Sequence, residues 1–444
     1  MFNHANSIFY LGGIMKYDKK IVLVYGLKKS GQSAAKFLSE RGALVYAYDD
    51  KENFVENATV IKNLSLLSGK NLDFVVLSPG VDINSPKIQE LLLSGVKIKS
   101  ELELGAENLK AKLFTITGTN GKTTCVNLLY NIFKQAGKET ELFGNVGTPI
   151  TSIVDNFKRT AYGVCEVSSF QMETTEKLKS FASALLNITP DHLDRHKTME
   201  NYINLKLKLL EQAKHKVFNA DDEISYNLSK RFNKAVLFSK NRATNGAYVK
   251  GEYIYYKNSK VMKTELVTLR GEKNLENVLA VITLAKLGGI KNADIIKGIT
   301  SFKPLEHRLE LVDIVDDVSF VDDSKSTNVA STLNAISAFT GKNIILLLGG
   351  RGKELDFAPI FENKLYAAVC FGECGLDILK VARAERVAYE ENLKAAFNKA
   401  YELARPGSVV LLSPACASFD EFTSYKQRGD YFKRLVRSVK MGER

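Results

Sequence analysis

The sequence predicts an α/β fold in three domains, and three observations carry that prediction. The chain has 444 residues, whereas one domain usually takes about 150 residues. Apolar strand-like runs alternate with segments of helical periodicity from residue 21 to near the end, a pattern typical of mostly parallel sheets. A glycine-rich turn over residues 117–124 joins one such strand to a helix. We expect an N-terminal domain over residues 15–107, a central domain over 108–304 and a C-terminal domain over 305–444.

The N-terminal domain begins with a strand, a turn, a helix and a second strand, as in half of a Rossmann-like dinucleotide-binding fold. The strands are expected at residues 21–25 and 43–48, and a further strand at 74–77. Lys28 stands where the middle glycine of G-x-G-x-x-G would be, which argues against close approach of a dinucleotide pyrophosphate. Two interpretations stay open: a nucleotide diphosphate held through Ser30 and the turn amides, or an ordinary strand-to-helix turn.

The central domain carries the phosphate-loop pattern of P-loop proteins. The turn with Gly118, Gly121, Lys122 and Thr123 follows the apolar strand 113–116 and opens a helix to about residue 135. Such a turn points backbone N–H groups and the positive end of a helix at phosphate oxygens, while the lysine reaches the terminal phosphates and the threonine can bind Mg²⁺. Ile116 occupies the place of the first glycine in the strict pattern. We expect ATP or GTP to bind here.

Further polar residues follow two more central strands. The buried-strand candidate 162–165 delivers Glu166 to its carboxyl end, where P-loop folds hold Mg²⁺. A strand at 184–188 leads into residues 189–196, which contain His192. This cluster could be a zinc site, an N-capped helix start, or a nucleotide and magnesium loop, and we favour the last. A helix over 202–213 carries Lys206 and Lys208, which the pattern alone places on a solvated face.

The C-terminal domain also alternates strands with helices. Strands are expected at residues 318–321, 344–348, 367–371 and 409–412, and polar loops follow three of them, at 322–328, 349–353 and 413–419. Ligands of open α/β sheets bind beyond the carboxyl ends of the strands. The three loops therefore predict a second substrate site.

Composition narrows the function classes. The net charge of +12 is spread along the chain without a basic stripe, so a phosphate-rich small substrate explains it at least as well as a nucleic acid. Five cysteines without a C-x-x-C pair indicate reduced thiols, and no apolar run is long enough to span a membrane. Residues 1–14 lack the features of a secretory signal. We expect a cytoplasmic protein that binds neither nucleic acid nor membrane. A regulatory GTPase is disfavoured because D-x-x-G and N-K-x-D are absent.

Five motifs together resemble the signatures of one enzyme family. They are Thr117-Gly-Thr-Asn-Gly-Lys-Thr-Thr124, Glu166-Val-Ser-Ser-Phe-Gln-Met-Glu173, Asn187-Ile-Thr-Pro-Asp-His-Leu-Asp194, His307-Arg308 and Asp323-Ser-Lys-Ser-Thr-Asn328. In this order they resemble the Mur ligases, ATP-dependent amide-forming enzymes of peptidoglycan synthesis. The resemblance implies a Rossmann-like N-terminal domain for a UDP-sugar, a central P-loop ATPase domain and a C-terminal Rossmann-like α/β domain for an amino acid.

Within that family, the C-terminal motifs are most similar to the branch that adds D-glutamate to UDP-N-acetylmuramoyl-L-alanine. These motifs are residues 411–422 and Gln427-Arg428-Gly429. The Asp-Asn-Pro-Arg sequence of diaminopimelate-adding relatives is absent. A related Mur-type or folylpolyglutamate-type ligase with another amino acid is the alternative.

The resemblance also implies roles for individual residues, with ATP as co-substrate and two Mg²⁺ ions. The catalytic residues would be Lys122, Glu166, His192 and Lys206, the last carbamylated. Thr123, Glu166, His192 and Lys206 would hold the metals. ATP would contact Gly118, Thr119, Asn120, Gly121, Lys122, Thr123, Thr124, Asn274, Asn277, Arg308, Asp323 and Lys325. The UDP-sugar would contact Ser30, Asp50, Lys51, Gly80 and Asn145, and D-glutamate would contact Thr327, Lys353, Ser418, Phe419 and Tyr425. A monomer is expected.

Three departures from the family pattern concern fine contacts. Lys273 stands where a histidine usually precedes Asn274, Asp50 and Lys51 replace a Thr-Arg pair on the uracil side, and Tyr425 takes a phenylalanine position. These changes bear mainly on the uridine pocket and leave the expected reaction class unchanged.

Overall fold

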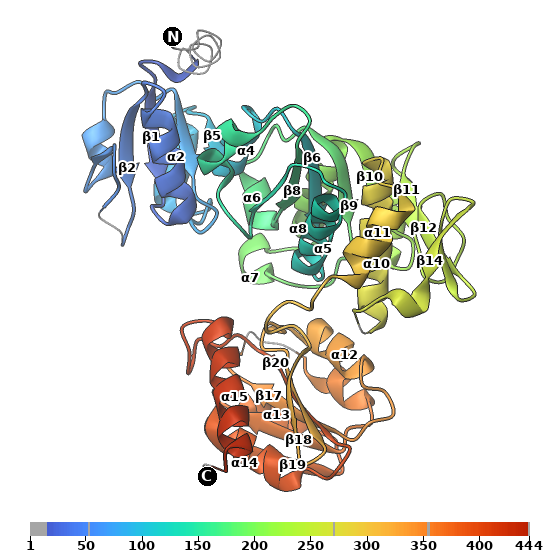
Figure 1. The fold of residues 1–444 in the computed structure, drawn as a ribbon. Helices are drawn as coiled ribbons and strands as arrows, with labels where there is room; N and C mark the ends of the chain where they lie inside the picture. Colours follow the sequence, from blue (N-terminus) through green and yellow to red (C-terminus); the bar gives the residue numbers. More distant parts are fainter. Residues whose placement is uncertain (1–15, 52–53, 270, 353–355, 443–444) are drawn as a thin grey trace. The chain divides into compact units, whose positions relative to one another are not determined.

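The computed structural model describes residues 16–51, 54–269, 271–352 and 356–442 (Figure 1). These residues divide into two compact units. The first runs to Leu266 and includes Glu276–Ser301, and the second comprises Val267–Leu275 and the residues from Phe302 onward. Val267–Leu275 groups with the C-terminal part, although the sequence pattern placed it in the central domain. Residues 1–14, considered above as a possible signal, lie outside the described residues.

The first unit begins with a five-stranded parallel sheet in the order β3-β2-β1-β4-β5. Its strands are β1 (Ile21–Tyr25), β2 (Leu44–Tyr48), β3 (Thr59–Val60), β4 (Phe74–Leu77) and β5 (Ile98–Ser100). Its helices are α2 (Lys29–Ser39), α3 (Pro86–Leu93) and α4 (Glu101–Ala106). Successive residues of β1 enter different cores, since Val22 and Val24 pack in one and Leu23 and Tyr25 in the other. Both faces of the sheet are therefore covered, as a parallel sheet requires.

A six-stranded parallel sheet follows in the first unit, in the order β11-β10-β9-β6-β8-β7. Its strands are β6 (Lys112–Thr117), β7 (Thr140–Gly144), β8 (Tyr162–Glu166), β9 (Ser180–Leu185), β10 (Ala213–Asn219) and β11 (Val236–Phe238). Its helices are α5 (Lys122–Gln135), α6 (Ser169–Glu173), α7 (Leu193–His196), α8 (Met199–Glu211), α9 (Glu223–Ser229), α11 (Asn292–Thr300) and, from Glu276 onward, α10 (Glu272–Leu287). The parallel sheet confirms the predicted central fold. The strand expected at 184–188 is earlier, at Ser180–Leu185.

A three-stranded antiparallel sheet was missed by the sequence analysis. It consists of β12 (Ala247–Lys250), β13 (Tyr253–Tyr256) and β14 (Ser259–Lys263). The signal was present as short strand-like runs, of which residues 253–256 are rich in tyrosine, separated by the turns Gly251-Glu252 and Lys257-Asn258. Such short runs with small turns are typical of hairpins.

The second unit contains a six-stranded sheet in the order β15-β16-β20-β17-β18-β19. Its strands are β15 (Glu310–Val315), β16 (Val318–Asp322), β17 (Ile344–Gly349), β18 (Ala367–Phe371), β19 (Arg386–Glu390) and β20 (Val409–Ala415). Its helices are α12 (Val329–Ser337), α13 (Gly375–Val381), α14 (Leu393–Leu403) and α15 (Tyr425–Lys440). Only β15 pairs antiparallel; the other pairs are parallel.

Helices cover both faces of this sheet. Ile345 and Leu347 of β17 pack in the core with Phe397 of α14 and Phe432 of α15. Leu346, between them in sequence, packs in the opposite core with residues of α12 and α13. The period of two along β17 therefore explains why this run of apolar residues is buried throughout.

Two further sequence expectations concern the whole chain. All five cysteines are buried and free, in agreement with reduced thiols. Among the residues that the structure describes, no helix combines the length and apolarity needed to cross a bilayer.

Candidate functional site

The phosphate loop lies between β6 and α5, as predicted. Gly121 is the N-cap of α5 with φ +87°, in the left-handed region. A Cβ at Gly121 would lie 2.3 Å from Oδ1 of Asn277, so any other residue would push this predicted nucleotide contact away. Glycine at this position therefore lets Asn277 pack directly against the loop at the N-terminus of α5, the end of a helix that attracts anions.

Two lysines meet at the carbonyl oxygen of Gly118. Lys122 Nζ donates to this oxygen at 2.8 Å and to the carbonyl oxygen of Thr119 at 2.7 Å. Lys206 Nζ donates to the Gly118 oxygen at 2.9 Å. Lys206 is 1% exposed, so the interpretation of its helix face as solvated is wrong for this residue. Lys208 keeps a partly exposed side chain and pairs with Glu176.

Burial changes the chemistry of Lys206. Desolvation, with the nearby Lys122 charge as second cause, holds the pKa of Lys206 well below its usual value, against the opposing effect of Asp191 and Glu166. A neutral amine is therefore favoured at this position. Its Nζ lies 4.4 Å from the centroid of the Tyr202 ring, and the hydroxyl of Tyr202 lies 3.1 Å from Thr119 Oγ1.

Glu166 lies at the end of β8 with one carboxylate oxygen paired and the other available. Oε1 accepts a hydrogen bond from Asn145 Nδ2 at 2.7 Å. Oε2 is buried without a hydrogen-bond partner, as are the hydroxyl oxygens of Thr117 and Thr189. A buried carboxylate oxygen without a donor is costly unless a cation satisfies it. Because oxygen ligands are those that Mg²⁺ prefers, this oxygen fits a magnesium ion.

Asn187 holds the phosphate loop from the end of β9. Its Oδ1 accepts from the backbone N–H of Asn120 at 2.9 Å, and its Nδ2 donates to the carbonyl oxygen of Asn120 at 3.1 Å. The carbonyl oxygen of Asn187 accepts from the N–H of Thr119 at 3.0 Å. In the sequence Asn187 stands out only as the first residue of the motif 187–194, which gives no sign of this role. A side-chain amide is suited to this position because it can donate and accept at once.

His192 precedes the short helix α7 and has a left-handed backbone, with φ 54°. Its Nε2 lies 3.6 Å from Asp191 Oδ2, and its ring packs against Phe170. A helix does start after His192, although its side chain makes no capping bond. The described residues do not place His192 in a group of three potential metal-binding side chains, which argues against the zinc interpretation. The magnesium interpretation stays a prediction.

The predicted UDP-sugar residues line one cavity of about 850 Å³ in the first unit. These residues are Ser30, Asp50, Lys51, Gly80 and Asn145. Residues of the N-terminal sheet and of the central sheet both contribute to it, so the tertiary structure brings together positions that are distant in sequence. Through Asn145 the cavity reaches the carboxylate of Glu166, which links it to the candidate metal position.

Asp50 is held in that cavity by three neighbours. Its carboxylate accepts from Tyr25 and Tyr48 hydroxyls, both at 2.9 Å, and from Lys87 Nζ at 2.5 Å. The hydrogen bond from Lys87 holds the pKa of Asp50 below its usual value. Lys87 was not predicted as a site residue. Asp49 instead closes the first turn, accepting from the N–H of Leu27 at 2.6 Å.

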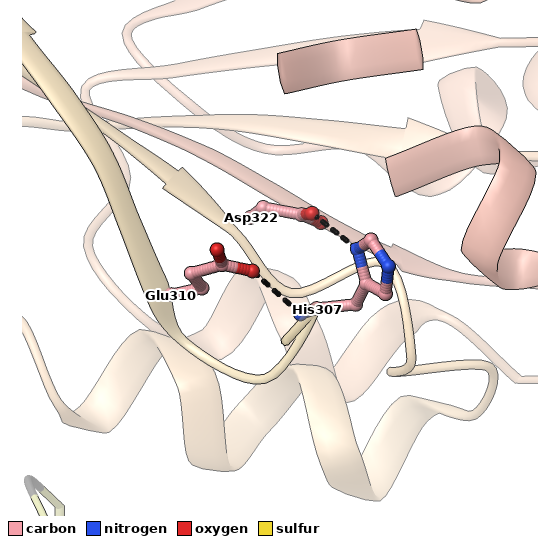
Figure 2. Close-up of side chains that lie close together, drawn as sticks. All are labelled: His307, Glu310 and Asp322. Atoms are coloured by element: carbon pink, nitrogen blue, oxygen red, sulfur yellow. Dashed lines mark hydrogen bonds and ion pairs between the residues drawn. The ribbon is translucent and has the colours of Figure 1, made fainter. Parts of the chain in front are cut away.

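Arg308 lies between two residues with left-handed backbones in the second unit, His307 (φ 60°) and Leu309 (φ 48°). Figure 2 shows the supports of His307: its Nδ1 lies 2.7 Å from Asp322 Oδ2, and its backbone N–H donates to Glu310 at 2.8 Å. These bonds stabilise the strained turn that presents Arg308.

His307, Glu310 and Asp322 could geometrically hold a metal ion. Their polar atoms already have protein partners, since Glu310 also pairs with Lys433 at 2.7 Å. Gly429 packs against the ring, and a Cβ there would lie 2.2 Å from His307 Nδ1. The cluster is therefore a satisfied structural network.

Asp323 is an internal anchor of the same region. Its Oδ2 accepts from the hydroxyls of Ser326 and Ser413, at 2.5 and 2.8 Å, and its Oδ1 accepts from the N–H of Leu309 at 3.2 Å. Burial raises its pKa to about 7. Both carboxylate oxygens thus have partners within the second unit.

The predicted D-glutamate residues differ in how the structure places them. Tyr425 opens α15, and its ring lies 4.2 Å from Lys325 Nζ, so a predicted amino-acid contact meets a predicted nucleotide contact. Ser418 is buried, Phe419 is exposed and Thr327 is half-buried. Lys353 lies outside the described residues.

The predicted nucleotide contacts Asn274 and Asn277 fall in different units. Asn274 groups with the second unit and Asn277 with the first, so each is placed only within its own unit.

Comparison with protein families gives three matches in chain order. The family model described as "Mur ligase MurD-like, N-terminal domain" matches residues 19–100, the "Mur ligase middle domain" matches 116–285, and the "Mur ligase, glutamate ligase domain" matches 307–416.

Curated relatives are similar over almost their full length. The UDP-N-acetylmuramoylalanine--D-glutamate ligase of Caldanaerobacter subterraneus is 38% identical, covering 96% of this chain and 100% of the relative. The enzyme of that name from Acidobacterium capsulatum is also 38% identical, covering 95% and 97%.

Solved structures share the fold at low sequence identity. A pseudomurein peptide ligase type C from Methanothermus fervidus has a TM-score of 0.64 at 17% identity, covering 95% of this chain and 100% of that one. UDP-N-acetylmuramate-alanine ligase from Thermotoga maritima has a TM-score of 0.59 at 18% identity, covering 95% and 99%.

Proposed function

The chain belongs to the Mur ligase family, and we propose that it is the ATP-dependent ligase that joins D-glutamate to UDP-N-acetylmuramoyl-L-alanine in peptidoglycan precursor synthesis. The observation that carries this proposal is 38% identity to a D-glutamate ligase over 96% of the chain and the whole relative. The predicted phosphate loop and the single cavity that collects the five predicted UDP-sugar residues support the same assignment.

The reaction requires activation of a carboxylate. The alanyl carboxylate attacks the γ-phosphorus of ATP, ADP leaves, and an acyl phosphate forms. The amine of D-glutamate then attacks the acyl carbon, loses a proton, and phosphate leaves as the amide forms. Direct attack of the amine on the unactivated carboxylate would have to expel oxide, which is a much poorer leaving group than phosphate.

We assign ATP to the loop 118–124, whose N–H groups and helix N-terminus favour phosphate oxygens. Lys122, which donates to two loop carbonyl oxygens, is well placed to donate to the terminal phosphates instead. Thr123, Glu166, His192 and a modified Lys206 would hold two Mg²⁺ ions. Magnesium, when bound, screens the repulsion between the carboxylate and the triphosphate.

Carbamylation of Lys206 fits its surroundings. The neutral amine adds to CO₂, forming an N–C bond, and one proton is released to solvent, which leaves a carbamate anion. A depressed pKa favours the amine form that reacts. The anion would also replace the repulsion between Lys206 and Lys122 by attraction, and would offer oxygen ligands to a metal.

We place D-glutamate at the carboxyl ends of β16, β17 and β20 in the second unit. Thr327, Ser418, Phe419 and Tyr425 are its predicted contacts there, with Lys353 as the predicted carboxylate partner. The domain limits given above, a monomeric state and a cytoplasmic location likewise stay predictions.

The test is release of ADP and phosphate from ATP by the purified chain with Mg²⁺ and UDP-N-acetylmuramoyl-L-alanine. We expect turnover with D-glutamate and little with L-glutamate, and mass spectrometry should show the new amide. Lys122→Ala serves as the inactive control. ADP release that does not depend on any amino acid would contradict the proposal.

A further inference from the structure

Arg428 is a buried cation that the proposed mechanism does not use. It lies in the first turn of α15, is 0% exposed, and is the bulkiest fully buried side chain among the described residues. Burial lowers its pKa to about 10, so the guanidinium stays charged at neutral pH. Within the part of the chain that the structure describes, its hydrogen bonds run to carbonyl and hydroxyl oxygens.

These bonds join three loops. Nε donates to Ser324 Oγ at 3.0 Å, and Nη2 donates to the Ser324 carbonyl oxygen at 2.9 Å. Nη2 also donates to the Cys416 carbonyl oxygen at 3.0 Å, and Nη1 to that of Ala417 at 3.3 Å. A longer bond of 3.5 Å runs from Nη1 to the carbonyl oxygen of Gly349.

The three loops follow neighbouring strands. Ser324 follows β16, Gly349 ends β17, and Cys416 follows β20; the sheet order places β20 between β16 and β17. Their carboxyl ends therefore lie side by side, and one planar guanidinium with five N–H donors spans them. The same loops carry the predicted ligand contacts Asp323, Lys325 and Ser418.

A purely stabilising role explains this arrangement poorly. Apolar packing does not require a cation here, since α15 already buries Phe432, Leu435 and Val436 in the core, whereas loss of Arg428 would leave buried carbonyl oxygens of separate loops without their donor. An apolar side chain at position 428 could pack, but it could not bond the carbonyl oxygens of separate loops. The lysine of a conservative variant could reach only part of this set.

We propose that Arg428 is a positioning residue that sets the spacing of the three loops on which the D-glutamate and ATP contacts of the second unit are built. This proposal rests on the proposed function. It assigns Arg428 no contact with either ligand.

The test compares Arg428→Met and Arg428→Lys with Arg437→Met, an exposed arginine on the same helix. Hydrogen–deuterium exchange is followed in peptides covering residues 322–328, 349–352 and 413–419, and KM is measured for each substrate. In Arg428→Met we expect faster exchange in these peptides and KM for D-glutamate and ATP raised tenfold or more. KM for the UDP-sugar, whose predicted site is in the first unit, should stay unchanged, Arg428→Lys should be intermediate, and Arg437→Met should behave as wild type.

Other results overturn the proposal. These are a folded Arg428→Met chain with wild-type exchange and KM values, or a loss of kcat with all three KM values unchanged. If Arg428→Met does not melt cooperatively, the exchange and KM values of Arg428→Lys decide whether Arg428 positions the loops. If neither variant folds, the proposal is overturned and Arg428 is assigned to folding alone. A wild-type chain that makes no ADP with D-glutamate refutes the proposed function instead, and the exchange measurement, which needs no substrate, still decides the role of Arg428.

Discussion

Lys122 and Lys206 donate to the same acceptor, the carbonyl oxygen of Gly118, from Nζ atoms 2.8 and 2.9 Å away. One lysine begins α5 and the other lies within α8. Two ammonium groups on one buried oxygen repel each other, and burial already disfavours the charged form of Lys206. This relationship makes the state of Lys206 a direct test of the proposed chemistry.

Depletion of CO₂ should inactivate the enzyme reversibly. We expect wild-type activity to fall in CO₂-free buffer, to return with bicarbonate, and to fall as pH falls, because protonation removes the amine that forms the carbamate. Lys206→Met should lose about 10²-fold or more in kcat, the size found when a group that stabilises transition-state charge is removed. Lys208→Met, on the same helix, is the control. Full activity of Lys206→Met would refute the proposed catalytic role of a carbamylated Lys206.

Asp323 should make the second unit less stable as pH rises. Its pKa is about 7 in the folded protein, whereas an aspartate in the unfolded chain has its ordinary pKa of 3.8, so between these two pH values the folded state binds more protons. Stability is therefore highest below the unfolded pKa and falls as pH rises through about 7. From pH 5.5 to pH 8 the loss should be about 2 kcal/mol. Urea unfolding should show this loss of unfolding free energy in wild type and not in Asp323→Asn. The same pH dependence of the unfolding free energy in both proteins would contradict the prediction.

Asn187→Leu should weaken ATP binding. The substitution removes the side-chain partner of the N–H and carbonyl oxygen of Asn120, and the loss of these partly buried hydrogen bonds costs about 0.5–1.5 kcal/mol each. Since the strain falls on the phosphate loop, KM for ATP should rise while KM for the UDP-sugar stays constant. Asn131→Leu, which removes an amide bonded to Gly298 outside the loop, is the control. An equal rise in KM for ATP in both variants would argue against the role of Asn187 in holding the phosphate loop.

Lys87→Ala should impair UDP-sugar binding without unfolding the protein. The exposed pair with Asp50 is worth at most about 1 kcal/mol of stability. Loss of Lys87 nevertheless frees the Asp50 carboxylate within the cavity, so KM for the UDP-sugar should rise while KM for ATP and D-glutamate does not. Lys36→Ala, which breaks another exposed pair in the N-terminal part, should leave all three constants unchanged. A selective rise in KM for ATP would contradict the cavity assignment.

Most central strands of the three mostly parallel sheets were predictable because a buried parallel strand is an apolar run between turns. Residues 74–77 and 367–371 form strands at the expected bounds. The sheet of β12 to β14 was missed because its strands are short and mixed with lysines, so it lacks a continuous apolar run. Likewise, the α8 pattern could not show that Lys206 points inward, since helical periodicity does not reveal which neighbour covers a face.

By itself the sequence determined the strand-to-helix phosphate loop and the alternation of strands with helices, because both depend on residues that are close along the chain. The resemblance carried by its motifs supplied the expected site residues. Only the tertiary structure decided that Lys206 is buried against Gly118, that Asn187 holds Asn120, and that Arg428 joins three loops. These contacts join segments far apart in sequence, and burial, which sets both their cost and their chemistry, exists only once the segments have packed together.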